Sequence, residues 1–242
     1  MIKTIKTMSK QEKERYTVPR KVQDVIPVRR IWPDGIFLVG NKFSKTYKFS
    51  DINYLVASRE DKESMFLTYS ELLNSLDSGA VTKITINNRR MNQANFETSI
   101  LMPMQGDFRD EYRGEYNQML LDKATGANGI MQEKYITISV VKKDVEEARA
   151  YFSRVGADLI SHFAALGSKC VELDATERLR ILHDFYRQGE ESEFVFNARE
   201  MMKRGHSFKD YICPDGIEKN SDYLKLGDKF CRVLFLKDYA SY

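Results

Sequence analysis

The sequence predicts an α+β protein: a two-layer α/β sandwich on a mixed sheet, with a small β lobe built from N- and C-terminal strands. Three observations favour this class. Short apolar runs separated by turn residues occupy residues 25–49 and 223–236, as is typical of strands. Between them, residues 60–173 alternate between helical and strand periodicity in the order α-β-β-α-β-α-β. Helices that return over a sheet in this way cover one of its faces.

The front of the chain predicts a β-hairpin over residues 25–39. Its turn is the Pro-Asp-Gly sequence at 33–35, because proline and glycine favour the backbone angles of a tight turn. Aromatic residues at alternate positions over 43–49 indicate a third strand directly after the hairpin.

The centre of the chain begins with a helix near 60–77, which Ser58 can cap and which Gly79 follows. A strand rich in β-branched residues follows at 81–87, and we expect residues 96–102 to be its partner. Apolar residues at helical spacing predict the next helix, which Thr125-Gly126 closes. These residues are Phe108, Tyr112, Tyr116, Met119 and Leu120.

The remaining elements follow the same logic. A strand is predicted over 135–141, a long helix from Asp144 to Gly167, and a short strand over 169–173. Two pairs with capping spacing then open shorter helices: Asp174 with Glu177, and Asn197 with Glu200. The last element is a hairpin over 223–236, turned by Gly227-Asp228.

These elements predict four segments. They are a basic flexible arm at 1–22, the N-terminal part of a β lobe at 23–57, an α/β sandwich domain at 58–205, and a β hairpin region at 206–242 that is a candidate to complete the lobe.

The composition predicts a cytoplasmic protein without a transmembrane segment. The 242 residues are 42% apolar, enough for a real core, yet no run of about 18 apolar residues occurs. The first thirty residues carry charges where a signal peptide needs an apolar stretch. The three cysteines are widely spaced, which favours reduced thiols over a disulfide framework.

Positive charge is concentrated at the N-terminus. Residues 1–30 hold nine basic and three acidic residues, so this segment has a charge of +6. The whole chain has a net charge of +3, so the remaining residues sum to −3. A basic arm suggests an anionic partner, namely nucleic acid, a lipid surface or an acidic protein, although a solvated tail has the same composition. The candidate contacts are Lys10, Lys13, Arg15, Arg20, Lys21, Arg89 and Arg90.

No motif in the sequence predicts a catalytic, cofactor-binding or metal-binding residue. The closest lookalike of a phosphate-binding loop, at 40–46, lacks the glycine before Lys45. The three histidines lie about twenty residues apart, and the cysteines show no close pair of zinc ligands, so His206 with Cys213 and Cys231 is a weak combination. No signature of a nucleophilic serine or cysteine occurs.

Several stretches taken together resemble one family. They are residues 49–54 (FSDINY), 57–62 (ASREDK), 69–77 (YSELLNSLD), 83–90 (KITINNRR), 115–120 (EYNQML), 156–159 (GADL) and 208–215 (FKDYICPD). In number and order they resemble the N-terminal region of type IV secretion system conjugation ATPases, of the TraE/TraC/CagE type found in integrative conjugative elements of Gram-positive bacteria. The resemblance covers the chain from about residue 20 to its end.

This resemblance implies a non-catalytic docking and assembly domain. In that family the region precedes an ATPase motor, which we therefore expect beyond residue 242 together with its ATP and Mg²⁺. The domain would anchor the motor to inner-membrane components of the secretion complex for DNA or protein export. It would lie in the cytoplasm at the inner face of the membrane and self-associate through the full-length ATPase. The alternative is a nucleic-acid-binding module that acts through the basic arm.

Overall fold

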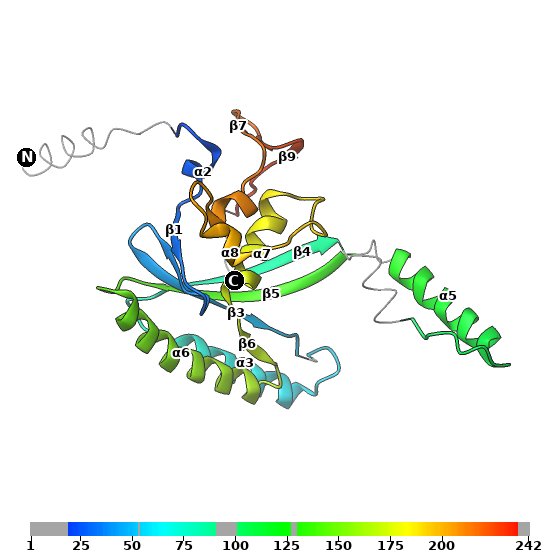
Figure 1. The fold of residues 1–242 in the computed structure, drawn as a ribbon. Coiled ribbons are helices and arrows are strands. Elements are labelled where there is room, and N and C mark those ends of the chain that lie inside the picture. The colour runs from blue at the N-terminus through cyan, green and yellow to red at the C-terminus, as the bar shows by residue number, and fades with distance from the viewer. Residues whose placement is uncertain (1–18, 53, 91–100, 127–129, 237–242) are drawn as a thin grey trace, which may run out of the picture. The chain divides into compact units, whose positions relative to one another are not determined.

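The computed structural model describes residues 19–52, 54–90, 101–126 and 130–236 (Figure 1). The chain divides into two compact units, one formed by Val28–Ile212 and the other by Met1–Pro27 with Cys213–Tyr242. Helices and strands are both abundant, and the predicted α+β class is confirmed. No helix in the described ranges is long and apolar enough to cross a membrane.

A six-stranded sheet organises the larger unit. Its strands are β1 (Val28–Ile31), β2 (Phe37–Val39), β3 (Lys42–Phe49), β4 (Val81–Arg90), β5 (Ile130–Val140) and β6 (Cys170–Glu172). The order is β1-β2-β3-β5-β4, and β6 pairs with β3 beside β2. Every described strand pair is antiparallel, so the predicted mixed sheet is wrong. The reason is that β4 and β5 form the two arms of one long ribbon rather than a parallel crossover.

The helices of this unit are named in chain order. They are α3 (Arg59–Asn74), α5 (Asp110–Gly126), α6 (Val145–Ala165), α7 (Ala175–Tyr186), the short α8 (Ala198–Met201) and the 3-10 helix η1 (Phe208–Tyr211). The predicted caps are confirmed where side chains accept backbone hydrogen bonds. Ser58 accepts from the amide of Asp61, Asp144 from that of Glu147, and Asp174 forms a capping box with Glu177.

One face of the sheet forms the core against α3 and α6. Alternate residues of β3, Phe43 and Tyr47, point to this face, and α6 contributes a stripe at helical spacing that includes Phe152 and Leu159. Gly156 allows a close approach, because a Cβ there would lie 2.6 Å from Glu172 Oε1 and 2.9 Å from the Tyr47 hydroxyl. The opposite face meets α7, whose Arg178 donates a hydrogen bond to Ser44 Oγ. The helices therefore lie on both faces, where a two-layer sandwich was predicted.

The hairpin predicted over 25–39 is confirmed as β1 and β2, paired through Val28–Ile31 and Phe37–Val39. Gly35 adopts a positive φ of 78°, and a side chain there would overlap the Leu173 carbonyl oxygen. These N-terminal strands belong to the large sheet and do not build a lobe with the C-terminal strands, because Phe43 and its core neighbours place β3 at the centre of that sheet.

The smaller unit contains α2 (Val22–Val25) and a separate antiparallel sheet of β7 (Ile217–Lys219), β8 (Leu224–Leu226) and β9 (Lys229–Cys231). The predicted C-terminal hairpin is confirmed as β8 and β9, turned at Gly227 with a φ of 56°. Its second strand is shorter than predicted, since residues 232–236 are not in a strand. Of the strand predicted over 96–102, residues 96–100 lie outside the described residues; the described partner of β4 is β5.

Candidate interaction surface

The predicted anionic contacts fall into three groups. Lys10, Lys13 and Arg15 lie outside the described residues. Arg20 and Lys21 are exposed at the start of α2, where the backbone amide of Lys21 donates to Asp24 at 3.2 Å. Arg89 and Arg90 end β4 in the other compact unit. The structure therefore does not define one basic surface from these residues.

Two hollows among the described residues differ in kind: a small one lies between α3 and α6, and one on α5 has a volume of about 590 Å³ but is wide open to solvent. No group of three or more His, Cys, Asp or Glu side chains among them is placed to hold a metal ion. A hollow between α3 and α6, lined by Asp77, Arg154 and Asp158 among others, has a volume of about 240 Å³. Ligand pockets are commonly about 300–1,000 Å³, so this hollow is small for one. Exposed surfaces are therefore the stronger candidates for a functional site.

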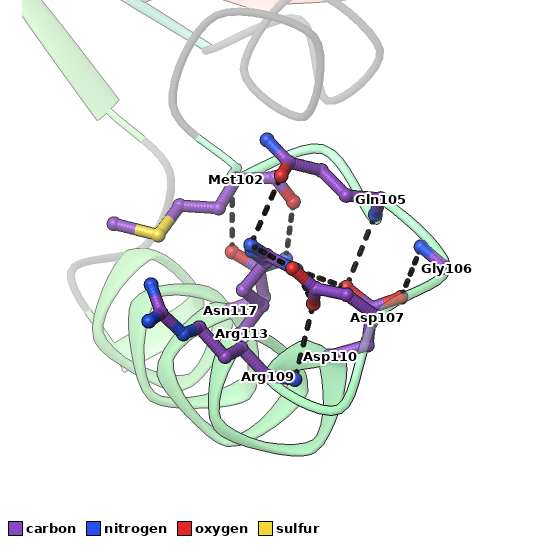
Figure 2. A network of polar contacts seen from close by, with 8 residues as sticks. All are labelled: Met102, Gln105, Gly106, Asp107, Arg109, Asp110, Arg113 and Asn117. Carbon is purple, nitrogen blue, oxygen red and sulfur yellow. Dashed lines mark hydrogen bonds and ion pairs between the residues drawn. The ribbon is translucent and has the colours of Figure 1, made fainter.

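The segment 101–126, between β4 and β5 in the sequence, is built around a polar network at the start of α5 (Figure 2). Asp110 accepts hydrogen bonds from the backbone amides of Gln105 at 3.1 Å and Gly106 at 2.7 Å. Arg113, one turn further on, bonds to both Asp107 and Asp110, the latter at 2.5 Å. Its second nitrogen donates to Gln105 Oε1 at 3.2 Å. Two carboxylates and one guanidinium thus fix the loop onto the first turn of the helix.

The electrostatics of this network favour the charged forms of its side chains. Hydrogen bonding from Arg113 is the main cause that lowers the pKa of Asp107 below its ordinary value. The pKa of Asp110 is also lowered, first by the backbone amide of Gln105 and then by Arg113. Both carboxylates in turn raise the pKa of Arg113. The network is therefore fully charged at neutral pH.

A second contact ties the loop further along the helix. The Asn117 side chain accepts a hydrogen bond from the backbone amide of Met102 at 2.8 Å and donates one to its carbonyl at 2.9 Å. Figure 2 shows this amide clamp beside the charged network. Together Asn117 and Arg113 turn one face of α5 toward the preceding loop, and both side chains are half-buried. One face of α5 is thus occupied by its own loop.

Another face of α5 is apolar and exposed. Tyr112, Tyr116 and Met119 are spaced four and three residues apart, which aligns them on one side of the helix. Their exposed fractions are 69%, 43% and 41%, and Phe108 in the preceding turn is 82% exposed. We call these four residues the aromatic face. Large apolar side chains gathered on one helix face and left in water are typical of a surface that binds another protein.

Negative charge runs along one side of the aromatic face. Glu111, Glu115 and Asp122 are exposed and spaced four and seven residues apart, which places them on one strip of α5. A partner groove for this helix would therefore need an apolar floor and basic side chains on the side that faces these carboxylates.

Sequence reasoning predicted this helix but not its exposure. The helical spacing of Phe108, Tyr112, Tyr116, Met119 and Leu120 predicts a helix and leaves open whether another part of the protein covers it. The distinguishing signal was present in the polar residues: Asp107, Asp110 and Arg113 occur at spacings that let them bond to one another, and Asn117 continues that face. A helix whose polar face binds its own loop leaves its apolar face available.

The structure defines an α+β fold with an exposed helix, α5, and its described residues contain no group of side chains placed to hold a metal ion. No protein-family model matches the chain, and no curated protein matches it either.

Proposed function

We propose that this chain is a non-catalytic docking and assembly domain of a conjugative type IV secretion ATPase, which anchors the motor to the inner-membrane transfer complex. The observation that carries the docking role is the aromatic face of α5. The family itself rests on the resemblance of the sequence motifs, several of which lie in elements that the structure describes, such as α3 and β4.

The aromatic face suits docking because it combines apolar area with low conformational freedom. Tyrosine has only two side-chain torsions, so ordering Tyr112 and Tyr116 in a groove costs less entropy than ordering long flexible side chains. The charged network of Arg113 and the Asn117 clamp hold the helix in shape before a partner binds. Such preorganisation increases affinity because less order has to be created on binding.

The partner's chemistry follows from the charges beside this face. Because Glu111, Glu115 and Asp122 border the apolar residues, we expect an inner-membrane component whose cytoplasmic part offers an apolar groove rimmed by Lys or Arg. Ion pairs at an exposed rim are screened by salt, so raising the ionic strength should slow association more than it speeds dissociation.

The test is co-purification of the full chain with each membrane protein encoded in the same transfer element, co-expressed one at a time. The wild type should retain one of these membrane proteins. The double variant Tyr112→Lys/Tyr116→Lys should retain at least tenfold less of it. Phe185→Lys is the matched control, since Phe185 is an exposed aromatic residue on α7. Retention that is equal in the double variant and the wild type would refute the role of α5.

A second measurement addresses the absence of catalysis. The purified chain should neither bind nor hydrolyse ATP, whatever happens at α5. ATP turnover by the chain alone that persists through further purification would overturn the proposal of a non-catalytic domain.

A further inference from the structure

The two edges of the large sheet differ in how they are protected. β1 is short, its register is interrupted between Val28 and Arg30, and Arg29 and Arg30 are exposed. Short, irregular and charged edge strands discourage pairing with another chain. β4, at the other edge, is ten residues long and pairs with β5 in an uninterrupted register from Val81↔Ser139 to Arg90↔Ile130. In the part of the chain that the structure describes, no strand pairs with the outer side of β4.

On the face that forms the core, β4 carries two exposed apolar side chains, Ile84 and Ile86. Ile84 lies opposite the buried Ile136, so both point to the α6 side of the sheet, and Ile86 follows on the same face. Ile84 is nevertheless 44% exposed and Ile86 is 56% exposed. Between Val81 and Asn88 there is no proline and only one charged residue, Lys83. The core thus continues to an edge that carries few of the usual protections.

We propose that the outer edge of β4 binds β4 of a second copy of this chain, antiparallel and about a twofold axis at Thr85. In this register Thr85 lies opposite its own mate and Ile84 lies opposite Ile86 of the other copy, twice by symmetry. Lys83 lies opposite Asn87, so no like charges meet. The core faces of the two sheets then join through four isoleucines.

Among the neighbouring symmetric registers of two β4 strands, the one centred on Thr85 matches the side chains best. A register centred on Ile84 places Ile86 opposite the polar Thr82, and one centred on Ile86 places Ile84 opposite Asn88. Only the register centred on Thr85 pairs isoleucine with isoleucine on both sides of the axis. The contact is also closed, because each β4 covers the other and leaves neither β4 edge open to a third copy. The strand is therefore self-complementary in apolar pattern, charge and symmetry.

The size of the contact predicts a reversible dimer. One pair of strands with its side chains lies at the lower end of specific interfaces, below about 1,200 Å² in total. We therefore expect a monomer–dimer equilibrium of the full chain in the micromolar range. The dimer does not depend on α5 or on membership of a secretion ATPase, so Tyr112→Lys/Tyr116→Lys should dimerise like the wild type.

Disulfide cross-linking tests the register. Directly opposed residues of antiparallel strands have Cβ atoms about 4.5–5.5 Å apart, which a disulfide can span with small adjustment. Thr85→Cys should therefore give a covalent dimer with oxidised glutathione. Lys83→Cys is the matched control, because its mate is displaced by four residues, roughly 13 Å along the strand. Both variants carry Cys231→Ser, since Cys231 is the native cysteine that is only half-buried. Equal cross-linking of the two variants, or none at Thr85→Cys, would overturn the proposal.

Sedimentation of the full chain tests the affinity. Ile86→Glu places a carboxylate beside Lys134, its neighbour on β5, so the fold should tolerate the substitution. In the dimer the same carboxylate would lie against Ile84 of the second copy, so the contact between the two copies should weaken. We expect the dimer dissociation constant to rise at least tenfold, and to stay unchanged in Val195→Glu, an exposed loop residue. A wild type that stays monomeric, or an Ile86→Glu dimer as tight as the wild type, would refute a second copy as the occupant. If Ile86→Glu fails to fold, the cysteine pair decides.

Discussion

The guanidinium carbon of Arg178 lies 4.0 Å from the centroid of the Phe37 ring, in a buried contact between α7 and β2. The same guanidinium donates hydrogen bonds to the carbonyl oxygens of Gly35 and Ser44, each at 2.7 Å, and to Ser44 Oγ at 3.1 Å. Burial lowers the pKa of Arg178 to about 9, so the side chain stays protonated at neutral pH. These contacts fasten α7 to the turn between β1 and β2 and to strands β2 and β3.

Replacing Arg178 should destabilise the larger unit. Arg178→Met keeps an apolar side chain near Phe37 but leaves the carbonyls of Gly35 and Ser44 without this donor, which we expect to lower the free energy of unfolding by about 2–4 kcal/mol. Urea denaturation followed by circular dichroism measures the change. Arg180→Met is the control, because Arg180 is on the same helix and only half-buried. Equal stability of Arg178→Met and the wild type would contradict this prediction and show that relief of the buried charge offsets the lost hydrogen bonds.

Two helical glycines should respond in opposite directions to alanine. At Gly156 the new Cβ would meet Glu172 and the buried Tyr47, so Gly156→Ala should destabilise by about 1–3 kcal/mol through overpacking. At Gly114 the nearest atom is Met104 Cε at 3.7 Å, an ordinary contact, so Gly114→Ala should stabilise α5 by up to about 1 kcal/mol. Thermal unfolding of the two variants beside the wild type checks the signs. A Gly156→Ala variant as stable as the wild type would contradict the close approach at Gly156, and a destabilised Gly114→Ala would contradict the open surroundings of Gly114.

Local structure was predictable where short-range chemistry decides it. The caps at Ser58, Asp144 and Asp174 and the turn glycine Gly35 all act within a few residues, and each is found where the sequence placed it. Strand pairing was not predictable in the same way, because β3 meets β5 about ninety residues further along the chain. The period of a strand shows which residues share a face but not which strand lies beside it.

Burial was the other property that the sequence left open. Arginine is usually a surface residue, yet Arg178 is buried. It donates hydrogen bonds to the carbonyl oxygens of Gly35 and Ser44, which are far away in the sequence. The aromatic face of α5 shows the converse, because Tyr112 and Tyr116 follow the pattern of a core helix and are exposed. Helical spacing identifies an apolar face, whereas tertiary packing decides whether anything covers it.

The three cysteines should differ sharply in reactivity. Burial, and then the nearby Glu172 carboxylate, raise the pKa of Cys170 to about 11. Compared with an ordinary pKa of 9.0, this shift lowers the thiolate fraction near neutral pH about 100-fold. Cys213 is buried as well, while Cys231 is half-buried. Iodoacetamide labelling of the native protein, read by mass spectrometry, should modify Cys231 first, and labelling in urea should modify all three.

The raised pKa of Cys170 also makes the stability of the protein fall as pH rises. Between pH 9 and 11 the unfolded chain loses the thiol proton while the folded chain keeps it, so this group's contribution to stability is full below pH 9 and falls as pH rises. Cys170→Ala should therefore show a smaller loss of stability across this window than the wild type. A steeper loss in the variant would contradict the assignment.

Acid should weaken the cap of α5, and Arg113 should affect its two carboxylates unequally. Both Asp107 and Asp110 have a pKa below the ordinary 3.8, so their contribution to stability is present above pH 3.8 and is lost as pH falls through the lower folded values. Arg113 is the main cause at Asp107, whereas backbone amides lead at Asp110. Arg113→Gln should therefore raise the pKa of Asp107 more than that of Asp110. Carboxyl carbon titration of the variant and the wild type by NMR measures both pKa values. Equal pKa shifts at Asp107 and Asp110 would mean that the Arg113 guanidinium, and not the backbone amides of the loop, is the main cause of the low pKa of Asp110.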